Sequence, residues 1–363
     1  MYLIATSDCL TKKTESQEQD YRSIKMDTET SSIRDDMSSI YMEEGSFWER
    51  THKPRLIILI RHGESESNKD KKINENVPNQ LVALTERGWD QAHRAGAELL
   101  KVLNVENRPL ANQLGKKYAI SKEDECGQLP MLGYKPLNKS LDKNIVFYTS
   151  PYRRTRETLK GVLNVLDEYN LQNTNVTTCP DYGYKPNGRQ KSAVWPSPDH
   201  RPSGEYENDK STHNIRNMAP GKTYLKYRVK DDPRIREQDF GNLQDVNNMQ
   251  DTLKKRAAYG HFFFRFPQGE SAADVYDRVA SFQETMFRHF NERHSHKPRD
   301  VVVLVTHGIY ARVFLMKWFR WTYEEFESFT NVPNGCMILM EYDEMLRKYV
   351  LRTQLPKWDM LEE

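Results

Sequence analysis

A histidine between an arginine and a glycine follows an apolar run, and this combination could transfer a phosphoryl group. The run Leu56–Ile60 leads directly into Arg61, His62 and Gly63. A neutral imidazole is a good nucleophile toward phosphorus, and a guanidinium neutralises the oxygens of a phosphoryl group. The sequence therefore indicates His62 as a candidate nucleophile and Arg61 as a candidate phosphate ligand.

A second histidine stands in the same kind of position. His307 follows the apolar run Val301–Val305 and precedes Gly308, where a helix is expected to begin. An imidazole beside a helix N-terminus favours a bound anion. Active sites of open α/β sheets lie beyond the carboxyl ends of the strands, so one sheet could bring both histidines together. We therefore expect His307 to bind phosphate.

The segment Arg61–Asn68, with the sequence RHGESESN, resembles the signature of the histidine phosphatase superfamily, phosphoglycerate-mutase-like branch. The family pattern is Arg-His-Gly-Glu-Ser/Thr-x-x-Asn, and each fixed position is met. The chain in this respect resembles the fungal and plant phosphoglycerate-mutase-like phosphatases. The resemblance implies a phosphohistidine intermediate on His62 without a metal or cofactor, because Arg and His supply the charge. Asn68 is expected either to contact the phosphate or to order this loop.

The same resemblance implies a second guanidinium and a proton donor. The family pattern Ser-x-x-x-Arg is met at Arg154, which is expected to bind phosphate. The pattern Arg-Glu-x-x-x-Gly is met at Glu237, which is expected to protonate the leaving oxygen. Burial or a nearby phosphate can raise a carboxyl pKa enough for this role. Arg153 and Arg156 remain alternatives to Arg154, and Asp239 remains an alternative to Glu237.

The segment Phe266–Ser271, followed by Arg278, also resembles the family, in the Gly-Glu-Ser sequence that precedes its penultimate helix. We expect them mainly to serve packing and positioning.

Strand-like and helix-like segments alternate from Arg55 onward. The apolar strands lack polar alternation, as expected for a parallel sheet that is covered on both faces. We therefore predict an α/β fold, a three-layer α/β/α sandwich with a mainly parallel central sheet. The expected strands are 56–60, 145–148, 301–305, 336–341 and 349–352, and the expected helix starts are Thr85, Ser150, Ser271 and Gly308.

Three polar segments depart from this alternation. Residues 1–52 are rich in Ser, Thr, Asp and Glu without a hydrophobic period, which predicts a disordered acidic and polar tail. The phosphatase domain is expected over residues 53–363. Residues 104–144 and 181–232 are polar and rich in Gly, Pro, Asn and Lys. We interpret both as insertions that could form a cap over the site.

Charge, apolar runs and cysteines narrow the class of protein. A net charge of +2 gives no reason to expect nucleic acid as a partner. No apolar run approaches the roughly 18 residues of a transmembrane helix. The 4 cysteines form no Cys-x-x-Cys pair, and no metal-ligand spacing is apparent, so a disulfide framework or metal site is not expected. These features predict a cytoplasmic protein that acts on a small phosphorylated molecule; a homo-oligomer stays open.

Three functions remain in view. A phosphatase that hydrolyses phosphomonoesters is favoured, because Glu237 lies in a phosphatase-like context. A phosphoglycerate mutase returns the phosphoryl group to a bound sugar acid and would need a carboxylate-binding lid, which residues 181–232 could supply. A non-catalytic scaffold that kept the fold is the third, and the presence of every catalytic position argues against it.

Overall fold

The computed structural model describes residues 53–119, 129–134, 144–174, 206–207, 225–241, 246–291 and 301–358. These residues belong to one unit, Arg50–Glu363. The predicted tail 1–52 lies outside the described residues. So do residues 120–128 and 135–143 of the first predicted insertion, and residues 181–205 and 208–224 of the second.

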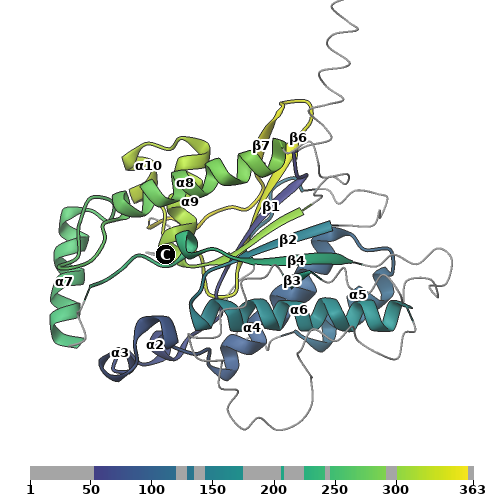
Figure 1. Ribbon diagram of the computed structural model, residues 1–363, viewed down its shortest axis with the longest axis horizontal. Helices are drawn as coiled ribbons and strands as arrows, with labels where there is room; N and C mark the ends of the chain where they lie inside the picture. The colour runs from purple at the N-terminus through teal and green to yellow at the C-terminus, as the bar shows by residue number, and fades with distance from the viewer. Residues whose placement is uncertain are drawn as a thin grey trace, which may run out of the picture. The chain divides into compact units, whose positions relative to one another are not determined.

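A mixed sheet forms the centre of the described fold (Figure 1). Its strands are β1 (Leu56–Arg61), β2 (Asn144–Thr149), β3 (Tyr206–Glu207), β4 (Lys226–Asp231), β5 (Val301–Thr306), β6 (Met337–Asp343) and β7 (Lys348–Leu351). They lie in the order β3-β4-β2-β5-β1-β6-β7. The central strands β4, β2, β5 and β1 are parallel to one another, and the outer pairings are antiparallel.

Helices cover both faces of this sheet (Figure 1). One face carries α4 (Glu86–Leu103), α5 (Arg108–Lys117) and α6 (Arg153–Thr174), and the other carries α8 (Ala272–Asn291), α9 (Gly308–Phe319) and α10 (Tyr323–Ser328). The shorter elements are α2 (Glu66–Lys69), α3 (Ile73–Asn76), η1 (Asn79–Leu81), η5 (Pro233–Ile235) and the more separate α7 (Val246–Tyr259). The predicted three-layer α/β/α sandwich is confirmed.

The central strands are apolar because they are buried on both faces. Leu56, Ile58 and Ile60 of β1 pack into the hydrophobic cluster shared with α4 and α6. The intervening Ile57 and Leu59 pack into a second cluster with α8 and α9. Each of these five side chains is fully buried. Each apolar position of this strand therefore contributes to one of two cores.

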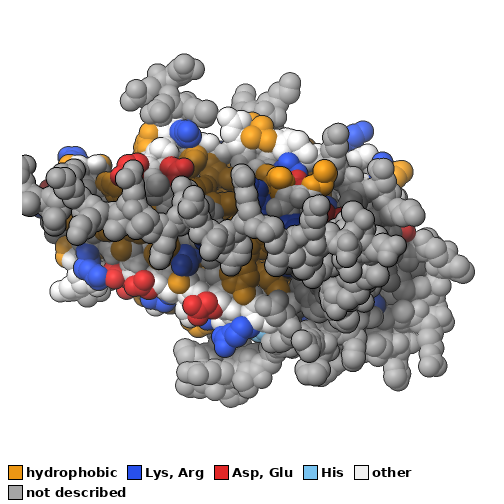
Figure 2. All heavy atoms as spheres, turned by 90° about the horizontal axis from the view of Figure 1, so that it is seen from above, with side chains coloured by type: hydrophobic (Ala, Val, Ile, Leu, Met, Phe, Trp, Pro, Cys, Tyr) orange, Lys and Arg blue, Asp and Glu red, His pale blue; other side chains and the backbone are white. Residues whose placement is uncertain are grey.

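The covering helices differ in how far they reach the surface. The inner side of α8 places Val279 and Phe282 in the core, whereas its Phe287 is exposed. Seen from above, the molecule shows hydrophobic side chains among Lys, Arg, Asp and Glu (Figure 2). α9, in contrast, is buried over residues 308–316.

Three of the four predicted helix starts are confirmed, and one is wrong. The Thr85 hydroxyl caps α4, the Ser271 hydroxyl accepts a backbone hydrogen bond from the first turn of α8, and α9 begins at Gly308. Ser150 was expected to cap α6, but the helix begins later, at Arg153. The chain still bends at Ser150, whose hydroxyl is engaged across the site instead.

Residues 226–231 correct one predicted boundary. They were expected within the insertion 181–232, yet they form β4, which pairs with β2 over its whole length. The polar sequence has a physical reason, because β4 has only the two-residue β3 beyond it and buries Tyr227 alone. The segment 104–144 likewise contains α5, which packs on α4 and α6. The two predicted late strands are confirmed as β6 and β7.

A close approach of α4 and α6 gives a test of this packing. A Cβ on Gly96 would lie 2.9 Å from both the Val162 carbonyl oxygen and the Val165 Cβ. The helices must shift to admit a methyl group, so Gly96→Ala is expected to lower the free energy of unfolding by about 1–3 kcal/mol. Urea denaturation measures this change.

The matched control is Gly115→Ala in α5, where the nearest atom is the mobile Lys101 Cε at 3.0 Å. This substitution is expected to be neutral or to stabilise by up to about 1 kcal/mol, because alanine favours the helix. Equal losses in the two variants would contradict the tight contact at Gly96.

Candidate active site

The candidate site forms where the parallel strands end. β1 and β5 are paired through their last residues, so His62 and His307, which follow them, lie at the same edge. Their ring centroids are 5.2 Å apart. β2 and β4 end at the same level and lead into α6, which carries Arg154, and into the loop that carries Glu237. The sheet thus brings four distant segments to one place.

The His62 imidazole is held in one orientation. Its Nδ1 lies 2.7 Å from the Gly63 carbonyl oxygen, the kind of backbone contact expected in this turn. A carbonyl only accepts, so Nδ1 carries the proton, and Nε2 accepts from Arg154 Nε at 3.3 Å. Burial, with the charges of Arg154 and Arg61, holds the pKa of His62 well below its ordinary value of 6.5. The imidazole is therefore neutral, and its Nε2 bears a lone pair.

Gly63 is required by the crowding of this turn. A Cβ there would lie 2.3 Å from the Gly88 carbonyl oxygen of α4. The Gly63 N–H donates to Thr158 Oγ1 at 3.0 Å, and Asn334 Nδ2 donates to the His62 carbonyl oxygen at 3.0 Å. Contacts from α4, α6 and the loop before β6 therefore fix the backbone that carries His62.

Asn68 orders the loop after His62. Its Oδ1 accepts from the Ser65 N–H at 3.1 Å and from the Ser65 hydroxyl at 2.8 Å. Asn334 Nδ2 approaches the same oxygen at 3.3 Å. Of the two roles predicted for Asn68, these contacts favour the ordering one.

Arg154 is buried and well supported. Its Nη1 donates to the Asn79 carbonyl oxygen at 2.7 Å and to Asn79 Oδ1 at 2.9 Å. The guanidinium also lies over the Tyr152 ring, 4.9 Å from its centroid. Burial lowers the pKa of Arg154 to about 10, so the group keeps its charge at neutral pH. Neither Asn79 nor Tyr152 was identified from the sequence, and only Tyr152 carried a signal, because it lies inside the Ser-x-x-x-Arg motif.

The neighbouring arginines have other partners. Arg153 donates to Glu157 of the same helix at 2.8 Å, and Arg156 donates to Asp231 at 2.6 Å. Each of these alternatives to Arg154 is thus paired with a carboxylate. Arg61, in contrast, contributes to the low pKa of both His62 and His307, and its Nη1 donates to the Val332 carbonyl oxygen.

His307 is oriented by Ser150. Its Nε2 lies 2.9 Å from the Ser150 hydroxyl oxygen, which also accepts from the Tyr152 N–H at 3.4 Å. The hydroxyl proton is then available to donate to Nε2, which leaves the His307 proton on Nδ1. This Nδ1 is buried and has no hydrogen-bond partner among the described residues. An anion at the site could accept that proton in a hydrogen bond.

Glu237 is the buried carboxyl group of the site. Burial raises its pKa above the ordinary value of 4.5, whereas the Arg154 charge and the hydrogen bond from the Gln238 N–H lower it. Burial has the larger effect, so the carboxyl tends to hold its proton. Asp239, the alternative acid, is exposed, and its Oδ1 accepts from the Gly241 N–H at 2.8 Å in a turn. The environment of Glu237 therefore suits a proton donor better.

No metal-binding arrangement was expected from the sequence. In the part of the chain that the structure describes, no group of three or more His, Cys, Asp or Glu residues could hold a metal ion. The His289 imidazole lies 3.1 Å from the Tyr148 hydroxyl through its Nδ1.

Comparison with known proteins decides the family. A family model described as the histidine phosphatase superfamily, branch 1, matches residues 217–353, which include Glu237 and His307 but not His62. The broad-range acid phosphatase DET1 of Saccharomyces cerevisiae is 64% identical over 306 residues, covering 84% of this chain and 91% of that protein. The chain belongs to the histidine phosphatase superfamily. It is a phosphatase that acts through a phosphohistidine intermediate.

Other relatives of this histidine phosphatase are more distant. Phosphoglycerate mutase-like protein AT74 of Arabidopsis thaliana is 32% identical over 317 residues, covering 85% of this chain and 73% of that protein. Among solved structures, a mycobacterial glucosyl-3-phosphoglycerate phosphatase is 16% identical, with 84% of this chain and 99% of that chain covered and a TM-score of 0.44. The curated relatives agree with the phosphoglycerate-mutase-like branch.

The orientation of His307 can be tested through Ser150. Ser150→Ala removes the hydroxyl beside Nε2, so the protonated Nδ1 is no longer favoured. We expect inorganic phosphate to bind about ten- to a hundredfold more weakly, the scale of one lost hydrogen bond to a charged group. The inhibition constant of phosphate measures this effect. Ser328→Ala, which removes a hydroxyl that donates within α10, is the control, and an unchanged constant in Ser150→Ala would contradict the assignment.

Proposed function

We propose that this chain hydrolyses phosphate monoesters of small molecules, with His62 as nucleophile and Glu237 as general acid and base. The observation that supports this most directly is the state of His62. Its Nδ1 is engaged by the Gly63 carbonyl oxygen at 2.7 Å, and its Nε2 faces the Arg154 guanidinium. A nucleophilic nitrogen and a phosphate-binding cation thus share one buried position.

In the first proposed step, His62 Nε2 attacks phosphorus. The N–P bond forms while the bond from phosphorus to the ester oxygen breaks, and Glu237 gives its proton to the departing oxygen. Arg61, Arg154 and His307 hydrogen-bond the equatorial oxygens. In phosphoryl transfer a protein lowers the activation barrier mainly by stabilising the negative charge on those oxygens.

In the second proposed step, water completes the hydrolysis. The Glu237 carboxylate takes a proton from water, whose oxygen attacks phosphorus. The N–P bond breaks, inorganic phosphate is formed, and His62 recovers its lone pair. Glu237 is then protonated again, so the cycle closes without another proton carrier.

The substrate range is proposed from the same geometry. Arg61, Arg154, His62 and His307 would all contact the phosphoryl group, and none of them needs to contact the alcohol part of an ester. The yeast relative is named a broad-range acid phosphatase, which supports acceptance of more than one small ester. Nucleic acid is not proposed as a substrate, because the net charge is only +2.

A cytoplasmic location is proposed from the helices and the cysteine spacing. Among the described residues no helix is both long and apolar enough to cross a membrane. The sequence also contains no Cys-x-x-Cys pair. Both observations support the proposal of a cytoplasmic protein.

Replacement of the nucleophile tests the mechanism. His62→Ala is expected to remove turnover of glycerol phosphate and to prevent labelling by a ³²P-phosphoester, because no nitrogen can accept the phosphoryl group. Acid-labile, alkali-stable label on the wild-type protein would identify the phosphohistidine. His289→Ala should keep both activity and label. Label that persists in His62→Ala would contradict the assignment, and conversion of 3-phosphoglycerate to its isomer instead of phosphate release would favour a mutase.

The lowered pKa of His62 and the raised pKa of Glu237 predict that activity is highest at acidic pH. A lowered His62 pKa keeps the nucleophile neutral below pH 6.5, and a raised Glu237 pKa keeps the acid protonated above pH 4.5. kcat/KM for glycerol phosphate should therefore be highest in mild acid and fall at higher pH as Glu237 loses its proton. Glu237→Gln should abolish this alkaline fall, whereas Asp239→Asn should retain it. Loss of the fall in Asp239→Asn alone would assign the acid to Asp239.

A further inference from the structure

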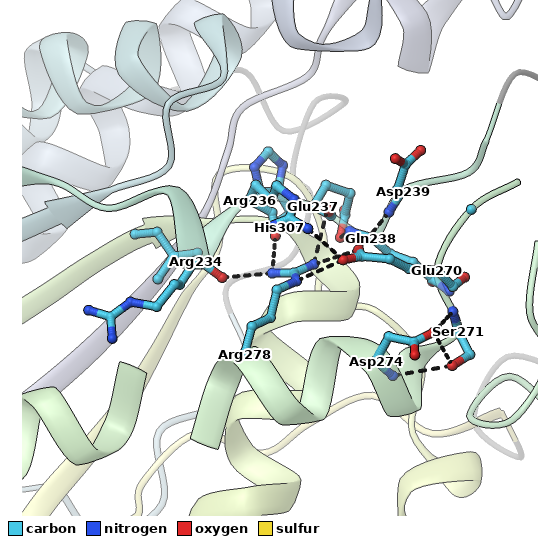
Figure 3. Close-up of polar contacts among 12 residues, drawn as sticks. Arg234, Arg236, Glu237, Gln238, Asp239, Glu270, Ser271, Asp274, Arg278 and His307 are labelled. Carbon is cyan, nitrogen blue, oxygen red and sulfur yellow. Dashed lines mark hydrogen bonds and ion pairs between the residues drawn. The ribbon is translucent and has the colours of Figure 1, made fainter. Parts of the chain in front are cut away.

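One guanidinium holds the backbone around Glu237. Arg278 of α8 donates from Nη1 to the carbonyl oxygens of Arg234 at 2.7 Å and Arg236 at 2.8 Å, and from Nη2 to that of Glu237 at 3.1 Å. Figure 3 shows this side chain with its hydrogen bonds directed into the loop. A planar fork of donors on one side chain thus fixes three carbonyl groups over four residues.

A carboxylate also binds this loop and pairs with Arg278. Glu270 accepts from Arg278 Nε at 3.2 Å and from Arg278 Nη2 at 3.0 Å. It also accepts from Arg236 Nη2 at 2.6 Å and from the Asp239 N–H at 2.9 Å. Glu237 therefore lies between two residues that the same carboxylate binds (Figure 3).

Other contacts of the loop lie after Glu237, where the Asp239 carbonyl oxygen accepts from the Glu270 N–H at 2.8 Å and Arg256 Nη2 donates to Gln238 Oε1 at 3.2 Å. Residues 236–241 form neither helix nor strand. Arg278 and Glu270 are well shielded, with side chains 10% and 16% exposed, and the Arg278 guanidinium lies over the Tyr310 ring. The Gln238 side chain adds a hydrogen bond to the Glu270 carbonyl oxygen at 2.8 Å. Buried, charge-assisted bonds of this kind constrain geometry more than exposed ones.

We infer that Arg278 and Glu270 are positioning residues that aim the Glu237 carboxyl at the leaving oxygen. This inference rests on the proposed function, since it needs Glu237 to donate a proton. A general acid must lie within hydrogen-bond reach of the oxygen that it protonates, and small displacements are costly. The ion pair contacts Glu237 through its backbone carbonyl oxygen, and the Arg278 charge also lowers the pKa of Glu237 and of His307.

The leaving group separates positioning from simple support of the fold. The alkoxide of glycerol phosphate needs a proton as it departs, whereas the acidic phenol of 2,4-dinitrophenyl phosphate leaves without one. A misplaced acid therefore lowers kcat/KM for the first ester only. A general loss of folded protein lowers kcat/KM for both esters equally.

The experiment compares kcat/KM for these two esters in matched variants. Arg278→Lys keeps the charge but loses the planar fork, and Glu270→Gln weakens the other arm. Both are expected to lose about 10²-fold on glycerol phosphate, the scale of a 1 Å misplacement, and little on the dinitrophenyl ester. Glu237→Gln is the reference and should show the same selectivity with a loss of about 10²–10⁴-fold.

The control is Arg312→Lys, which alters another buried arginine of the core. Arg312 donates to the Phe326 carbonyl oxygen at 2.8 Å and lies over the Phe326 ring, away from the Glu237 loop. It should show no leaving-group selectivity. Equal losses on both esters in Arg278→Lys and Glu270→Gln, or failure of both to fold, would overturn the inference alone. An absence of selectivity in Glu237→Gln would overturn the proposed role of Glu237 and the inference with it.

Discussion

The site depends on a neutral imidazole held beside buried guanidinium groups. Arg154 and Arg61 both disfavour a proton on His62 Nε2, and burial acts in the same direction. A buried guanidinium is itself costly unless its donors are satisfied. Asn79 and the Tyr152 ring meet that need for Arg154. A guanidinium that the protein's own groups hold in place limits the reorganisation that binding of a phosphoryl group would require.

Two means of positioning operate in this site. His62 and His307 directly follow strands that are paired to their last residues, so the sheet itself sets the 5.2 Å between their rings. Glu237 lies beyond η5, in a segment without helix or strand, where the sheet no longer constrains the backbone. The Arg278–Glu270 pair replaces sheet hydrogen bonds there with side-chain ones. The groups proposed to bind phosphate and the group proposed to move the proton are thus positioned by different structures.

The sequence predicted those strands whose side chains are almost fully buried. The apolar runs of β1, β2 and β5 predicted a parallel centre, and the motif residues His62, Arg154, His307 and Glu237 come from the ends of these and one further strand. β4 escaped prediction because its outer neighbour is short and its exposed positions are polar. The contact of Ser150 with His307 was equally hidden, because it joins residues 157 positions apart that only the strand register brings together.

Exclusion of water prepares the proposed nucleophile and the proposed acid at once. Desolvation disfavours whichever form of a group is charged, so it lowers the pKa of His62 and raises that of Glu237. The guanidinium of Arg154 reinforces the first effect and opposes the second. The placement of Glu237 relative to that charge therefore decides whether it is protonated when His62 is neutral. A loop held by carbonyl contacts rather than by the carboxyl itself leaves the Glu237 side chain available for proton transfer while its backbone stays fixed.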